Sequence, residues 1–184
     1  MSIGTSIAGR KHKDGIDFYQ TPQWAIEALL DVEKFEGSVY ECCSGAGAIS
    51  KVLEDQGYSV ISSDIREDDN VYGTKGVNML ELEDEVVANN IVTNPPFFCA
   101  QQVIEKSLKL TDKKVVMLLK LTFLESERRK EFFENTPLSR VYVFRKRVTM
   151  YPEGTEKPKN SSTVTYAWFI WEHGYKGEPV IRWI

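Results

Sequence analysis

The chain of 184 residues has few of the residues on which extracellular or zinc-binding folds depend. It contains 3 cysteines, of which Cys42 and Cys43 are adjacent, and 2 histidines, His12 and His173, which lie far apart. These numbers cannot supply a disulfide framework, and the spacings fit no zinc-ligand pattern. We therefore expect no metal site and a reducing, cytoplasmic environment.

Long apolar segments are also missing. No run approaches the roughly 20 residues of a bilayer-spanning helix, and the N-terminus lacks the hydrophobic core of a signal peptide. Hydrophobic residues make up 42% of the chain and charged residues 27%, the balance of an ordinary globular domain. We therefore expect neither a secreted nor a membrane-spanning protein, and no membrane partner.

The length suits a single domain. Residues 1–17 are polar, rich in glycine and serine, and without periodicity, which predicts a mobile N-terminal arm. Residues 18–184 are expected to form one domain, with no separate domain for target recognition. The oligomeric state is left open.

The formal net charge of −4 is divided unevenly. Residues 1–92 hold 7 Lys and Arg against 17 Asp and Glu, a balance of −10, whereas residues 93–184 hold 16 against 10, a balance of +6. A positive stripe attracts phosphates, although solvated surface faces give the same pattern. The candidates for binding a nucleic-acid backbone are Arg145, Arg147, Lys157 and Lys159.

Short apolar runs alternate with segments of helical period, which predicts an α/β fold. Strands are predicted at 38–43, 58–63, 90–93, 114–119, 139–144, 164–171 and 178–184. Helices are predicted after a Thr21 cap and Pro22, and over 49–56, 82–89, 101–110 and 125–135. Strands separated by such helices indicate a mostly parallel twisted sheet with helices on both faces. The last two strands have no helix between them, so an antiparallel C-terminal edge is expected.

Polar and glycine residues gather at the predicted strand ends, where open sheets of this kind bind ligands. The first strand leads into Glu41-Cys-Cys-Ser-Gly45-Ala-Gly47, in which glycines permit a sharp turn and a close approach to a ligand. Asp64 ends the next strand and is suited to accept ribose hydroxyls, and Asn78 is placed to read an adenine edge. A dinucleotide fingerprint is excluded, because it would require glycine where Ser50 stands. The pattern favours a cationic, phosphate-free nucleoside as the ligand. The alternative is a tight strand-to-helix turn that binds no ligand.

Asn94-Pro95-Pro96-Phe97 is the sharpest motif in the chain. Two prolines build a stiff loop without backbone donors, so the loop presents the Asn94 side-chain oxygen, the Pro95 carbonyl and a flat ring. These groups suit a planar aromatic amine. Hydrogen bonds to both of its N–H groups would draw the nitrogen towards sp³ geometry and free its lone pair for reaction. The alternative is a proline-rich turn capped by a core phenylalanine.

Together, Glu41, the glycine turn, Asp64 and the Asn-Pro-Pro-Phe motif resemble the class I S-adenosylmethionine-dependent methyltransferases in their amino-methylating branch. The chain looks most like small phage-type N6-adenine DNA methyltransferases. Phe18-Tyr-Gln-Thr21-Pro22 resembles the N-terminal cofactor motif of that branch. The resemblance covers roughly residues 18–121 in detail, with two departures: position 78 is Asn where many relatives carry Asp, and position 97 is Phe rather than Tyr.

The resemblance implies a Rossmann-like methyltransferase fold that transfers a methyl group from S-adenosyl-L-methionine to the N6 amine of adenine in DNA. Its catalytic residues would be Asn94, Pro95, Pro96 and Phe97. Its cofactor-binding residues would be Tyr19, Thr21, Pro22, Glu41, Gly45, Gly47, Asp64 and Asn78. The target adenine would be single-stranded or flipped out of the duplex.

Three alternatives stay open at this point. The same planar NH₂ group occurs on an RNA base and on a protein glutamine, and the fold also suits a catalytically inactive cofactor-binding module. A cytosine-C5 reaction through Cys99 is disfavoured, because Phe97 and Phe98 separate this thiol from Pro96. The target sequence and the biological role of the methyl mark do not follow from the residues.

Overall fold

The structure is a computed structural model that describes residues 19–152 and 164–184. The predicted arm at 1–17 and the candidate residues Lys157 and Lys159 lie outside the described residues.

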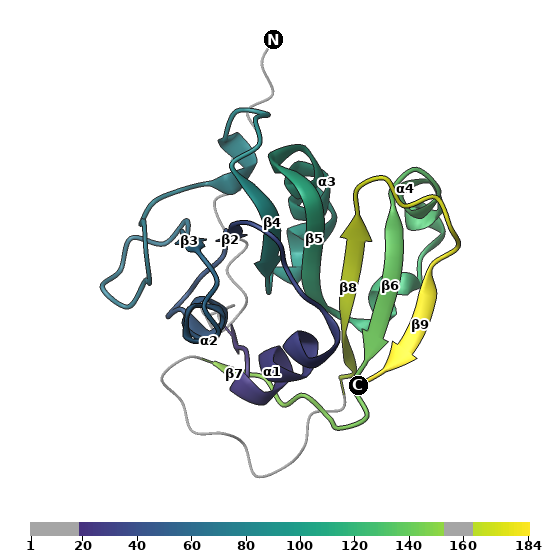
Figure 1. The fold of residues 1–184 in the computed structure, drawn as a ribbon, viewed down its shortest axis with the longest axis horizontal. Coiled ribbons are helices and arrows are strands. Elements are labelled where there is room, and N and C mark those ends of the chain that lie inside the picture. Colours follow the sequence, from purple (N-terminus) through teal and green to yellow (C-terminus); the bar gives the residue numbers. More distant parts are fainter. Residues whose placement is uncertain (1–18, 153–163) are drawn as a thin grey trace.

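A seven-stranded sheet crosses the molecule in the order β3-β2-β4-β5-β8-β6-β9 (Figure 1). Its strands are β2 (Val39–Glu41), β3 (Val60–Ser62), β4 (Ala88–Thr93), β5 (Thr111–Lys120), β6 (Leu138–Val143), β8 (Tyr166–Glu172) and β9 (Val180–Trp183). Neighbouring strands are parallel except that β8 runs antiparallel to β5 and to β6. The α/β class and the mostly parallel sheet are confirmed.

The expected antiparallel edge is wrong in its position. The antiparallel strand β8 lies inside the sheet between β5 and β6, and the edge strand β9 is parallel to β6. Residues 166–171 of β8 are all buried, whereas every residue of β9 is exposed. A strand that is apolar on both faces is stable only where layers cover both faces, which places β8 in the interior.

Helices cover both faces of the sheet. α1 (Gln23–Val32) and α2 (Ala48–Asp55) pack on the near face in Figure 1, and α3 (Ala100–Leu110) and α4 (Lys130–Glu134) on the far face. Alternate residues of β5 serve the two layers, with Val116 in the core on the α1 side and Met117 in the core on the α3 side. The result is three layers with two apolar cores.

Two predicted helices differ from the structure. Residues 82–89 form no helix, since a 3₁₀ turn at Met79–Glu81 leads through a loop into β4 at Ala88. The apolar residues Val86 and Val87 are 58% and 39% exposed, so they share no buried face with Leu82 despite their helical spacing. The segment 125–135 holds a 3₁₀ turn, Glu127–Arg129, followed by the short α4.

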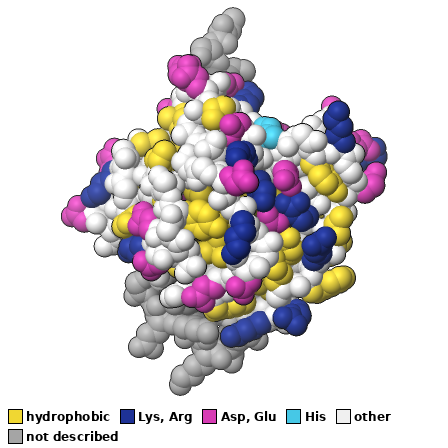
Figure 2. Space-filling model, viewed as in Figure 1, with side chains coloured by type: hydrophobic (Ala, Val, Ile, Leu, Met, Phe, Trp, Pro, Cys, Tyr) yellow, Lys and Arg dark blue, Asp and Glu magenta, His cyan; other side chains and the backbone are white. Residues whose placement is uncertain are grey.

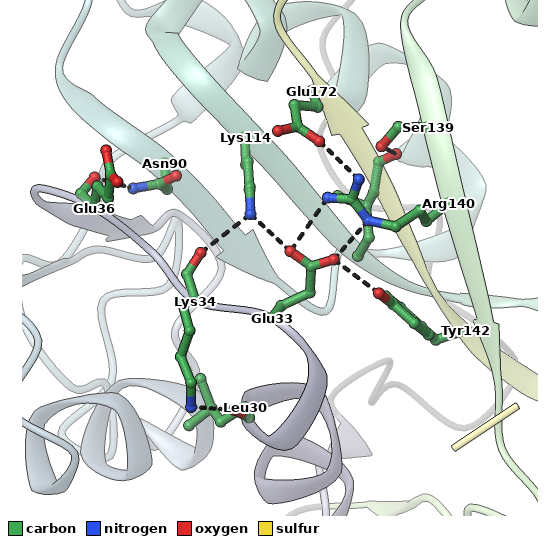
Figure 3. Close-up of polar contacts among 11 residues, drawn as sticks. Leu30, Glu33, Lys34, Glu36, Asn90, Lys114, Ser139, Arg140, Tyr142 and Glu172 are labelled. Carbon is green, nitrogen blue, oxygen red and sulfur yellow. Dashed lines mark hydrogen bonds and ion pairs between the residues drawn. The ribbon is translucent and has the colours of Figure 1, made fainter. Parts of the chain in front are cut away.

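A cluster of charged side chains around Glu33 ties the end of α1 to the sheet (Figure 3). The Glu33 carboxylate accepts hydrogen bonds from Lys114 Nζ at 2.7 Å, Arg140 Nε at 2.6 Å and the Tyr142 hydroxyl at 2.9 Å. Arg140 also pairs with Glu172 at 2.8 Å. Glu33 is only 4% exposed, and three donors compensate the cost of burying its charge. The cluster fixes the position of α1, which follows directly on Thr21 and Pro22.

Candidate active site

The candidate residues meet at the carboxyl ends of the parallel strands. This edge lies at the bottom of Figure 1, where the arrowheads of β4, β6 and β9 point. The strands β1 (Tyr19–Gln20) and β7 (Tyr151–Pro152) form a separate two-stranded sheet, called the ribbon below, which lies at the same edge. Tyr19 pairs with Pro152 and Gln20 with Tyr151, both antiparallel. Sequence spacing could not predict this pairing, which joins two dipeptides from opposite ends of the chain.

The glycine turn after β2 takes the conformation that glycine allows. Gly45 and Gly47 have φ angles of +50° and +79°. A Cβ on Gly45 would meet only Arg66 Nη1, at 3.9 Å, so open space adjoins this residue. A Cβ on Gly47 would lie 2.5 Å from Tyr72 Cγ. Open space therefore adjoins Gly45, whereas a tyrosine ring packs against Gly47.

Glu41 is buried beneath this turn. Its carboxyl accepts hydrogen bonds from the Ser50 backbone N–H at 2.8 Å and from the Ser50 hydroxyl. That hydroxyl also lies 2.6 Å from Ser62 Oγ. Burial raises the pKa of the Glu41 carboxyl to about 8, although the bonds from Ser50 act against the rise. The carboxyl is therefore mostly protonated at neutral pH. Ser50, which counted in the sequence only as a missing glycine, is the residue that orients Glu41.

Asp64 follows β3 and faces the glycine turn. Its Oδ2 accepts from the Gly45 N–H at 2.8 Å and its Oδ1 from the Arg66 N–H at 2.9 Å, which leaves a lone pair on each oxygen. The Asp64 carbonyl accepts from Val77 N at 2.9 Å, so the next residue, Asn78, lies nearby. The side chain of Asn78 forms hydrogen bonds within its own segment, since it accepts from Leu80 N and donates to Glu81.

Asn94 is held by its amide nitrogen. Asn94 Nδ2 donates to the Tyr19 carbonyl and to Thr21 Oγ1, both at 3.3 Å, and lies 3.6 Å from Met150 Sδ. Among residues 19–152 and 164–184, Asn94 Oδ1 is a buried oxygen without a hydrogen-bond partner. Buried polar atoms without partners are rare in native folds and cost about 1–3 kcal/mol, so this acceptor calls for an explanation.

The rest of the motif forms a corner beside this oxygen. Pro95 is buried, and within the described segments no hydrogen bond to its carbonyl is found. The Pro96 carbonyl accepts from Cys99 N at 3.2 Å. The Phe97 ring is half-buried, 5.8 Å from the Tyr166 ring, and Lys120 Nζ lies 4.6 Å from its centroid. The structure thus brings Asn94, Thr21 and Phe97 to one edge, together with Lys120 and Met150, which the sequence did not single out.

The predicted nucleic-acid residues follow β6 at the same edge. Arg145 and Arg147 are exposed, and the Arg145 N–H donates to the Ile184 carbonyl at 2.8 Å. Figure 2 shows a small group of Lys and Arg side chains near the C-terminus, while elsewhere on this face positive and negative groups alternate. Arg140, within β6, forms ion pairs with Glu33 and Glu172.

In segments 19–152 and 164–184, no helix is long and apolar enough to cross a membrane. Over the same segments, no group of three or more His, Cys, Asp or Glu side chains could hold a metal ion.

No protein-family model matches the chain, and no curated protein matches it significantly. Solved structures do. The modification subunit of a "putative type I restriction enzyme" from Vibrio vulnificus YJ016 has a TM-score of 0.61 at 13% identity, over 91% of this chain and 47% of that one. A "putative RNA methyltransferase" from Pyrococcus horikoshii has a TM-score of 0.59 at 14% identity, over 85% of this chain and 87% of that one.

Magnesium protoporphyrin IX methyltransferase from Synechocystis PCC 6803, solved with bound S-adenosylmethionine, has a TM-score of 0.55 at 14% identity, over 82% of this chain and 78% of that one. At these identities the likeness concerns the fold. The chain has the Rossmann-like methyltransferase fold expected from its sequence.

Proposed function

We propose that this protein is an S-adenosylmethionine-dependent N-methyltransferase that acts on the N6 amine of adenine in DNA. The observation that carries the proposal is the Asn94 side chain, whose nitrogen is held by two acceptors while its buried oxygen has no partner in the described part of the chain. Such an oxygen lacks a hydrogen-bond donor, and an amine N–H is a donor of that kind. The fold, shared with methyltransferases of nucleic acids and small molecules, supports the reaction class.

The residues at the strand ends fit the cofactor. Asp64 keeps one lone pair on each oxygen for ribose hydroxyls, and the space beside Gly45 admits a ligand close to the backbone. Glu41 is a buried carboxyl whose ionisation a nearby ammonium or sulfonium would favour. When bound, S-adenosylmethionine supplies an electrophilic methyl group on a positively charged sulfur.

Asn94 and Pro95 perform the part of the chemistry that this chain supplies. Their oxygens accept the two N–H groups of the amine, which weakens the delocalisation of its lone pair into the ring. The amine nitrogen then forms a bond to the methyl carbon, the electron pair of the carbon–sulfur bond stays on sulfur, and the nitrogen loses one proton to water. Because Asn94 Oδ1 is shielded from solvent, the side chains that cover it must move as the base enters.

Phe97 and Lys120 favour a nucleotide as the substrate. A half-buried phenylalanine ring stacks on a flat base, and the Lys120 ammonium, 4.6 Å from the ring centroid, lies where the phosphate of the same nucleotide can approach. A protein glutamine has neither an aromatic ring nor a phosphate. Arg145 and Arg147, with Lys157 and Lys159 outside the described residues, are proposed to contact the DNA backbone.

The test is methyl transfer from labelled cofactor to unmethylated single-stranded and duplex DNA, followed by nucleoside analysis. We expect N6-methyladenine with the wild type, loss of transfer in Asn94→Ala, and wild-type activity in Asn135→Ala, a variant of an exposed asparagine that bonds only to its own helix. Transfer to RNA or to a glutamine peptide, but not to DNA, would overturn the substrate. Intact cofactor binding without transfer to any substrate would instead identify an inactive binding module.

A further inference from the structure

We propose that Thr21 and Met150 are positioning residues, which hold the Asn94 amide with its oxygen turned towards the substrate amine. This inference rests on the proposed function and goes beyond it, since Thr21 was expected to cover the cofactor and Met150 was assigned no role.

Thr21 does not cap the helix it precedes. The sequence predicts a Thr21 cap, but the residue at the N-cap of α1 is Pro22, which makes no side-chain cap bond. Thr21 is nevertheless 4% exposed, and its hydroxyl accepts from Asn94 Nδ2 at 3.3 Å. A buried hydroxyl at this position therefore has a partner in the catalytic motif rather than in its own helix.

The surroundings of Asn94 also fix which way its amide points. The Tyr19 carbonyl and the Met150 thioether sulfur are acceptors without a hydrogen to give. Turning the amide over would place Asn94 Oδ1 against these two acceptors and remove the bonds at 3.3 Å and 3.6 Å. The acceptors around Asn94 Nδ2, which are the Tyr19 carbonyl, Thr21 Oγ1 and Met150 Sδ, form what we call the clamp. Both Nδ2 hydrogens are thus directed at the clamp, and the oxygen is left for the substrate.

The β1–β7 ribbon brings Thr21 and Met150 to the same side chain. β1 and β7 pair Gln20 with Tyr151 in antiparallel register. Thr21 follows Gln20 and Met150 precedes Tyr151, so both lie just beyond the last pair of the ribbon, and both contact Asn94 Nδ2. Two segments far apart in sequence thus meet on one side chain, and the bonds that orient Asn94 come from both of them.

The experiment compares Thr21→Val, which keeps the shape and loses the hydroxyl, with Thr21→Ser, which keeps the hydroxyl. In the full-length protein we expect Thr21→Val to lower kcat about tenfold, the rate equivalent of one hydrogen bond. The KM for DNA and the Kd for S-adenosylmethionine should change less than about twofold, and Thr21→Ser should recover most of kcat. Met150→Leu, of similar volume, should lower kcat about threefold, since a sulfur acceptor is weak.

Two results would overturn the inference. One is a Thr21→Val variant with wild-type kcat; the other is a rise in the Kd for S-adenosylmethionine that accounts for the lost activity, because Thr21 would then hold the cofactor. A double-mutant cycle between Thr21→Val and Asn94→Ala, read by urea unfolding, keeps the test independent of catalysis. If the wild type is inactive on every substrate, the proposed function fails, while non-additive unfolding free energies still support the clamp and additive ones refute it.

Discussion

Replacing Glu33 by glutamine should destabilise the protein far more than any exposed charge would. The substitution keeps the size of the side chain and removes the carboxylate that accepts from Lys114, Arg140 and Tyr142. The two cations, whose side chains are each 19% exposed, would then lack their shared counter-charge. Losing one member of a buried ion pair is strongly destabilising, because the remaining charge stays desolvated.

The magnitude follows from what the cations retain. Arg140 still pairs with Glu172 at 2.8 Å, and Lys114 still donates to the Lys34 carbonyl at 3.1 Å. Both are also partly hydrated, so the loss should fall below the ~3–5 kcal/mol of a fully buried pair, at about 2–3 kcal/mol. For a domain of this size, that lowers Tm by roughly 5–10 °C.

Urea unfolding at neutral pH is the assay, with Glu27→Gln as the matched control. Glu27 lies on the same helix, is exposed and bonds only to Gln23, so its loss should cost less than about 0.5 kcal/mol. Equal unfolding free energies for the two variants would refute the reasoning.

The pH dependence of the same comparison is a second readout. Burial acts to raise the pKa of Glu33, but the hydrogen bonds from Lys114, Arg140 and Tyr142 outweigh it, and the pKa is lowered. The contribution of Glu33 is therefore present above the pKa of an unfolded glutamate and is lost as the pH falls through the lower, folded value. The difference between the wild type and Glu33→Gln should shrink below about pH 4.

Three further outcomes are expected. Gly47→Ala should lower Tm more than Gly45→Ala, because both place alanine at positive φ but only the first meets an aromatic ring at 2.5 Å; equal Tm losses would contradict this. Because the folded pKa of Glu41 is raised to about 8, the wild type should lose unfolding free energy between about pH 5 and pH 8, and Glu41→Gln should not, as measured by urea titrations at both values. Lys120→Met should raise the KM for DNA and reduce its salt dependence by about one charge, whereas Lys113→Met, at the other end of the same strand, should leave both unchanged.

The parts of the fold that the sequence predicted are those with a strong local pattern. The apolar residues of the predicted strand 114–119, which are 115–119, identified the central strand β5, because a strand covered on both faces buries side chains on both. The Asn-Pro-Pro-Phe corner fell at a strand end as expected, since proline stops the ladder of β4. Asp64 and the glycine turn meet at the same edge, because the carboxyl ends of parallel strands always do.

The remaining features depend on contacts between distant segments, which no local pattern encodes. Thr21 before a proline looks like a helix cap, and only the folded chain brings Asn94 to its hydroxyl. Likewise, a strand as apolar as β8 must be covered, but the sequence does not say between which neighbours. In the sequence Lys120 is only the residue that ends an apolar run. Its place beside the candidate site is evident only from the structure, where its ammonium lies over the Phe97 ring.

The two residue pairs that join β1 to β7 also bear on how the protein matures. Closing a contact across so much intervening chain is entropically slow, and so short a ladder contributes little cohesion until the sheet beneath it exists. The ribbon should therefore form last on refolding and open first in mild denaturant. A refolding sample can accordingly reach its full tryptophan fluorescence and a cooperative melting transition before the proposed methyl transfer recovers. The recovery of fluorescence and the recovery of activity therefore have to be timed separately.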